Sequence, residues 1–168
     1  MQTAPATKPA GSSTAKLIIP FVNSVRLVFE TMVKVQTTVN APRLKADPCP
    51  TYDVSGIIGF SGDVIGSVVV SLQMHAAKSL VAAFAGCAIE PGTPDFSDAI
   101  GELANMIAGG AKKHLGANAN ITVPSVIIGA GHQIARLSGV PCIVIPCSTP
   151  AGDFAVEVNV KQIIQSLQ

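Results

Sequence analysis

The chain has few charged and few aromatic residues, and both shortages narrow what it is expected to bind. Of its 168 residues, 12% are charged and 4% are aromatic, and the formal net charge is +1. About a quarter of the residues are charged in an average soluble domain. Without a basic run, or rings on which bases could stack, the sequence gives no reason to expect a nucleic-acid partner. The low charge also suggests apolar surface hidden in an oligomer.

Long hydrophobic runs are missing as well, so no membrane association is expected. No apolar run approaches the roughly 18 residues that span a bilayer. Residues 1–15 are small, polar and proline-bearing. They lack the apolar stretch of a secretory leader, so the sequence predicts a disordered tail over 1–15 and a single domain over 16–168.

The cysteines do not form a metal-binding or disulfide pattern. None of the four belongs to a CxxC pair, and two of them lie five apart in a strand-like run, where their side chains should point to opposite faces. We therefore expect reduced, buried thiols in a cytoplasmic protein. The four are Cys49, Cys87, Cys142 and Cys147.

Several catalytic signatures are also absent. The sequence contains no GxGxxG fingerprint, no Walker loop and no GxSxG motif, so neither nucleotide binding nor a serine nucleophile is expected. Its histidines, His75, His114 and His132, stand far apart and form no ligand-spaced cluster. Each is more readily explained as a core or surface histidine than as a metal ligand, and we expect no metal to be bound by this chain.

What is present predicts an α+β fold with a largely antiparallel sheet, because strands in hairpins stand beside separate helices. Residues 53–72 resemble a hairpin whose glycines permit bulges or close packing against a helix. Pro20 fits the first turn of the first helix. The predicted helices cover 18–35, 74–84, 98–115 and 161–168; the further strands cover 120–128, 140–146 and 153–160, with a strand or extended loop over 37–45.

The helix expected over 98–115, with Asp95 or Ser97 as its cap, carries the candidate chemistry. Its apolar face holds Ile100, Leu103, Ile107, Ala111 and His114, whereas the opposite face holds Asp98, Glu102, Asn105 and Gly109. Glycine costs about 1 kcal/mol in a helix interior relative to alanine. A helix that contains both Gly109 and Gly110 is expected either to pack closely against another part of the protein or to let a partner approach it closely. Glu102 and Asn105 alone would equally fit an ordinary solvated helix face.

The context of this pair resembles the CheX branch of the CheC/CheX/FliY family of chemotaxis phosphatases. That family's motif is Asp or Ser, three residues, Glu, two residues and Asn, which here is Asp98, Glu102 and Asn105. The segments 53–71, 105–115 and 123–132 also look similar to CheX. The resemblance extends from residue 18 to the C-terminus. The first helix has Asn23 and Glu30 in the wrong order for a second motif, which fits one active helix per chain.

The resemblance implies a central sheet with two long helices on one face, and a homodimer joined through the sheets. It implies hydrolysis of the aspartyl phosphate of a receiver protein, CheY. Asn105 would orient the attacking water, and Glu102 would pair with a lysine of the receiver. Asp98 would be an accessory contact or a helix N-terminal charge, and Gly109 and Gly110 would admit the partner. Magnesium would be held by the receiver.

Two alternatives remain at this point: a binding module that docks on receivers without turnover, and a structural part of a flagellar switch. A dimer is also suggested independently by residues 153–160, DFAVEVNV, which alternate as a half-buried strand. An exposed apolar strand of this kind invites pairing with the edge of a second copy.

Overall fold

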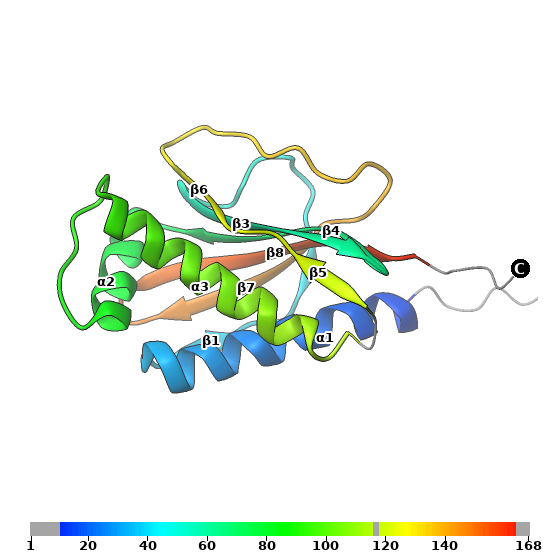
Figure 1. The fold of residues 1–168 in the computed structure, drawn as a ribbon, viewed down its shortest axis with the longest axis horizontal. Coiled ribbons are helices and arrows are strands. Elements are labelled where there is room, and N and C mark those ends of the chain that lie inside the picture. Colours follow the sequence, from blue (N-terminus) through cyan, green and yellow to red (C-terminus); the bar gives the residue numbers. More distant parts are fainter. Residues whose placement is uncertain (1–10, 116–117, 164–168) are drawn as a thin grey trace, which may run out of the picture.

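Eight antiparallel strands form one sheet, with helices on one of its faces (Figure 1). The computed structural model describes residues 11–115 and 118–163. The main strand order is β1-β7-β8-β4-β3-β5; β2 also pairs with β7, and β6 with β3. The predicted α+β class and antiparallel sheet are confirmed. The strands are β1 Thr38–Val39, β2 Arg43–Leu44, β3 Val54–Gly62, β4 Val64–Leu72, β5 Ala119–Ile121, β6 Ser125–Ile128, β7 Ile143–Thr149 and β8 Gly152–Gln162.

Two long helices, α1 (Gly11–Val28) and α3 (Pro94–Lys112), pack against each other on this face, as predicted. Helix α1 continues as a π-helical turn, η1 (Phe29–Val33), which ends where Lys34 adopts φ 58°. A shorter helix, α2 (Met74–Ala85), ends at Gly86 in the left-handed conformation that glycine favours. None of the helices in the described ranges is long and apolar enough to cross a bilayer.

The hairpin predicted over 53–72 is confirmed as β3 and β4, paired from Val54 with Leu72 to Phe60 with Gly66. Its glycines allow the predicted close packing against a helix. A β-carbon at Gly56 would lie 3.0 Å from Ala104 Cβ and 3.2 Å from the carbonyl oxygen of Ile100, both on α3. Glycine therefore sets how closely α3 approaches the sheet.

Both ends of the chain differ from expectation. Helix α1 begins at Gly11, so residues 11–15 are helical rather than part of a tail, and residues 1–10 lie outside the described range. Pro20 consequently lies inside the helix and not in its first turn, where its ring removes one helical hydrogen bond. At the other end, β8 extends to Gln162, so 161–162 are strand rather than helix; residues 164–168 lie outside the described range.

Three strand boundaries also differ. The strand predicted over 120–128 is divided into β5 and β6, with Pro124 in the break, because proline has no N–H to give to a ladder. The strand predicted over 140–146 is β7, which begins three residues later, at Ile143. The segment 37–45 forms two short strands rather than one element.

Strand β8 is buried on both faces, which corrects the half-buried strand expected over 153–160. Every residue from Phe154 to Val160 is buried. Val156 and Val158 belong to the core under the helices, whereas Glu157 and Asn159 lie on the opposite face and bond to the loops that cover it. Because β8 pairs with β4 on one side and β7 on the other, it has no free edge for a second copy.

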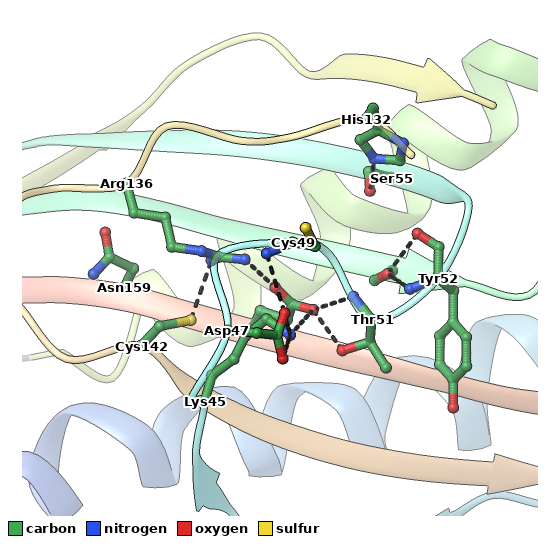
Figure 2. A network of polar contacts seen from close by, with 12 residues as sticks. Lys45, Asp47, Cys49, Thr51, Tyr52, Ser55, His132, Arg136, Cys142 and Asn159 are labelled. Atoms are coloured by element: carbon green, nitrogen blue, oxygen red, sulfur yellow. Dashed lines mark hydrogen bonds and ion pairs between the residues drawn. The ribbon is translucent and has the colours of Figure 1, made fainter. Parts of the chain in front are cut away.

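A single carboxylate on β8 bonds to both of the loops that cover the face of the sheet opposite to the helices (Figure 2). Glu157 is fully buried and accepts hydrogen bonds from the backbone N–H of Thr51 at 2.7 Å and its hydroxyl at 2.6 Å. It is also paired with Arg136 and, at 3.7 Å, with Lys45 Nζ. Asn159 bonds to the same loop as Arg136, through Leu137 N at 2.7 Å. No local pattern predicted this network, since Glu157 follows the alternation of an exposed position.

The cysteines divide into two pairs. All four are free; Cys142 and Cys147 are buried as expected, whereas Cys49 and Cys87 are exposed, contrary to expectation. Cys147 belongs to the core under the helices. Cys142 accepts a hydrogen bond from Arg136 at 3.1 Å, on the loop side of the sheet. The two buried thiols therefore occupy opposite faces, as the odd spacing predicted.

Candidate catalytic helix

Helix α3 begins earlier than its sequence pattern indicated. It starts at Pro94 rather than 98, and its cap is Thr93 rather than Asp95 or Ser97: the Thr93 hydroxyl accepts a hydrogen bond from Phe96 N at 3.3 Å. A hydroxyl residue followed by proline is a favourable helix start, because proline's missing N–H would have no partner in the first turn. Asp98 therefore lies one turn inside the helix.

The apolar face of α3 is buried as predicted, except at its end. Ile100, Leu103, Ile107 and Ala111 are buried. His114 is exposed and lies beyond the last helical residue, Lys112, so it is not part of the core face. The chain leaves the helix in a tight turn in which His114 N donates to Ala111 O at 3.0 Å.

The opposite face brings the predicted polar residues together. Asp98 and Glu102 are exposed, and Asn105 is half-buried. Asn105 Nδ2 donates to Glu102 Oε2 at 3.5 Å. Within the described ranges Glu102 has no ion pair, so its carboxylate can accept a cation from outside. The Asn105 carboxamide can both donate and accept hydrogen bonds. On this face, Glu102 can therefore bind a cationic group while Asn105, beside it, orients a water molecule.

The two glycines of the helix have different surroundings. A β-carbon at Gly110 would collide with the hydroxyl of Ser24 on α1, and Ser24 also donates to Ile107 O at 2.7 Å. Close contact between the two helices thus accounts for Gly110 without any partner. At Gly109 the nearest neighbour of such a carbon would be Ile121 Cδ1 at 3.9 Å, an ordinary van der Waals distance, so no collision accounts for Gly109 as one does for Gly110.

A third glycine, Gly101, was not singled out from the sequence. A β-carbon there would lie 3.0 Å from Pro124 Cγ, in the break between β5 and β6. Its i, i+4 relation to Asn105 was the available signal, because residues four apart share one side of a helix. The break between β5 and β6 therefore flanks the Asn105 side of α3.

Metal ligands are not gathered at this helix. Among residues 11–115 and 118–163, no group of three or more histidine, cysteine, aspartate or glutamate side chains could hold a metal ion. Glu102 and Asp98 alone supply fewer oxygens than the near-octahedral shell that magnesium demands. The donor set on α3 thus does not fit a magnesium site belonging to this chain.

Comparison with known proteins gives matches along most of the chain. A family model described as chemotaxis phosphatase CheX matches residues 54–148, which include the whole of α3. The CheY-P phosphatase CheX of Thermotoga maritima is 25% identical over 152 residues, covering 88% of this chain and 97% of that protein.

Solved structures of similar proteins share the fold. The chemotaxis protein CheX from Desulfovibrio desulfuricans superposes with a TM-score of 0.78 at 33% identity, covering 88% of this chain and 99% of that one. The CheX of a CheX–CheY–BeF3–Mg complex from Borrelia burgdorferi superposes with a TM-score of 0.72 at 23% identity, covering 87% and 98%. At that identity the second likeness concerns the fold alone.

Proposed function

The chain belongs to the CheX family of chemotaxis phosphatases, and from this premise we propose that it hydrolyses the aspartyl phosphate of a CheY-type receiver. The observation that carries the proposal is the position of Glu102 and Asn105, one turn apart on the open face of α3 and joined by a 3.5 Å hydrogen bond. A carboxylate and a carboxamide so placed can enter the receiver's phosphorylated pocket together. A cytoplasmic location follows from a partner of this kind.

The proposed reaction asks little chemistry of this chain. An acyl phosphate is already activated, so the phosphatase need only place one water in line with the phosphorus. Asn105 can accept from that water through its carbonyl oxygen and donate through its amide, which fixes the water's position. Well-fixed geometry can lower a barrier by several kcal/mol, on the order of 7–11 in the best intramolecular cases. The half-buried position of Asn105 restricts the motion of its side chain.

Glu102 and Asp98 are proposed to bind the receiver rather than to react. Glu102 is exposed and unpaired by any cation in the described chain, so it can pair with a lysine beside the receiver's phosphoaspartate. Asp98 lies one turn earlier and would add an accessory contact. Gly109 has no side chain on the other side of Asn105, so the partner's backbone can approach the helix closely there.

Magnesium in this proposal belongs to the receiver and neutralises charge on the phosphoryl group. The Borrelia complex, which contains CheX, CheY, BeF3 and magnesium, supports a CheY-type partner that carries the metal.

We also propose a homodimer joined through the sheets. Sedimentation equilibrium should then report twice 17.1 kDa, and a monomer at micromolar concentration would contradict it.

The decisive experiment measures phosphate release from a phosphorylated receiver with the wild-type protein, Asn105→Ala and Asn23→Ala. The last variant removes an exposed asparagine from the neighbouring helix and serves as the matched control. We expect Asn105→Ala to reduce release to the receiver's own rate with an unchanged circular dichroism spectrum, and Asn23→Ala to retain activity. Activity should also vanish when a chelator removes the receiver's magnesium.

Full activity in Asn105→Ala would exclude the water-orienting role. A wild-type protein that binds the phosphorylated receiver without accelerating release would instead be a binding module, and the proposed reaction would be wrong.

A further inference from the structure

The break between β5 and β6, residues 122–124, forms a wall beside the catalytic face of α3 (Figure 1). A β-carbon at Gly101 would lie 3.0 Å from Pro124 Cγ, and one at Gly109 would lie 3.9 Å from Ile121 Cδ1. Gly101, Asn105 and Gly109 are successive i, i+4 positions, so all three share one side of the helix. Asn105 therefore faces the stretch between Ile121 and Pro124.

This wall is held firmly at both of its ends. Thr122 N donates to Gly59 O at 3.0 Å, and Gly59 N donates to the Thr122 hydroxyl at 2.9 Å. At the other end, Pro124 packs against the bare backbone of Gly101. The residue between them, Val123, is 85% exposed. Its backbone is thus fixed by both neighbours while its side chain stands in solvent.

We propose that Val123 is the apolar anchor with which this protein docks on its receiver, inserting into an apolar depression beside the receiver's phosphoaspartate pocket. The inference rests on the proposed function, because a single exposed valine is ordinary in a soluble protein. Two features distinguish Val123: the fixed backbone on either side of it, and its position next to the helix side that carries Asn105. A receiver that reaches Asn105 would therefore lie beside Val123.

The polar groups of α3 give a physical reason for such an anchor. Asp98 and Glu102 are exposed, and ion pairs between exposed groups contribute little affinity. Binding surfaces usually draw their energy from a buried apolar centre surrounded by polar groups. A valine whose backbone is already ordered loses little conformational freedom on docking. Val123 would supply affinity, and Glu102 with Asn105 would supply register and chemistry.

The test separates docking from catalysis. Val123→Asp should raise KM for the phosphorylated receiver about tenfold, the effect of losing one buried valine side chain, while kcat at saturating receiver stays unchanged. The affinity for a receiver carrying beryllofluoride should fall by the same factor. Val123→Ala should give a smaller change in the same direction and guards against misfolding of the charged variant.

Leu44→Asp is the matched control, because Leu44 is 64% exposed and lies on β2. Strand β2 pairs with β7, toward the opposite edge of the sheet from β5 and β6. The Leu44→Asp variant should leave both KM and the beryllofluoride affinity unchanged.

Equal KM in wild type and Val123→Asp would overturn the anchor, as would a fall in kcat with KM unchanged. If the wild type binds without turnover, the proposed reaction fails, and the affinity comparison still decides the anchor. If the wild type does not bind at all, both proposals fail.

Discussion

The hydroxyl of Ser24 on α1 occupies the space that a β-carbon at Gly110 of α3 would need. The same hydroxyl donates to Ile107 O at 2.7 Å, so the two long helices are joined by a buried polar contact at a point of close approach. This contact fixes α3 from the side opposite to Asn105. The face that carries Glu102 and Asn105 therefore projects from a helix that is held by α1 on one side and by the β5–β6 break on the other.

The first prediction compares the two neighbouring glycines of α3. Gly110→Ala should lower the free energy of unfolding by about 1–3 kcal/mol, because the added methyl group collides with Ser24. Gly109→Ala should be neutral or stabilising by up to about 1 kcal/mol, because alanine favours helix and has 3.9 Å of clearance. Urea unfolding of both variants measures the difference. Equal stability of the two would show that the helices can separate freely.

The second prediction concerns Glu102. Glu102→Gln keeps the shape of the side chain and removes its charge, so affinity for a beryllofluoride-loaded receiver should fall by about two- to fivefold, the effect of losing an exposed ion pair of up to about 1 kcal/mol. Turnover should fall as well, and the salt dependence of binding should weaken. Titration at two ionic strengths measures this. Unchanged affinity together with an unchanged rate would refute the docking role.

The third prediction concerns the buried carboxylate of Glu157. Arg136→Met should destabilise the protein by about 3–5 kcal/mol, because it leaves a fully buried charge with only Lys45 and the Thr51 donors as partners. Arg43→Met, at an exposed arginine on β2, should change stability by less than about 0.5 kcal/mol. Denaturant unfolding compares them, and hydrogen exchange should show faster opening of residues 129–142 in Arg136→Met alone. Similar stabilities of the two variants would contradict the stabilising role of the Arg136–Glu157 ion pair.

The fourth prediction concerns alkaline pH. Burial raises the pKa of the Cys147 thiol from 9.0 to about 12. The folded state therefore keeps a proton that the unfolded chain releases above pH 9, so this contribution is complete below pH 9 and is lost as pH rises from 9 to about 12. Each pH unit in that window removes about 1.4 kcal/mol.

Unfolding free energies of wild type and Cys147→Ala at pH 7 and pH 10 check this dependence. The stability advantage of the wild type should shrink at the higher pH by roughly 1 kcal/mol. A constant difference between the two proteins would contradict it.

Local patterns in the sequence were enough to place the hairpin and helix α3. The 53–72 hairpin was evident because apolar arms flank the turn-forming residues 61–64, and the core face of α3 was evident from the 3.6-residue period of Ile100, Leu103 and Ile107. Helix ends were less accurate. The hydrophobic periodicity did not indicate the Thr93–Pro94 cap. It placed His114 on the apolar face, but the helix ends at Lys112, so the helical period no longer applies at position 114.

The sequence by itself determined the antiparallel α+β class and the helix that presents Asp98, Glu102 and Asn105 together, because both are indicated by patterns among residues near each other along the chain. Only the tertiary structure decided the surroundings of Glu157, Gly110 and Val123. Glu157 alternates like an exposed residue but is buried by loops whose cations come from positions 45 and 136. Gly110 is explained by Ser24, and the position of Val123 by Gly59 and Gly101. Such contacts join residues far apart in sequence, so no local pattern reports them.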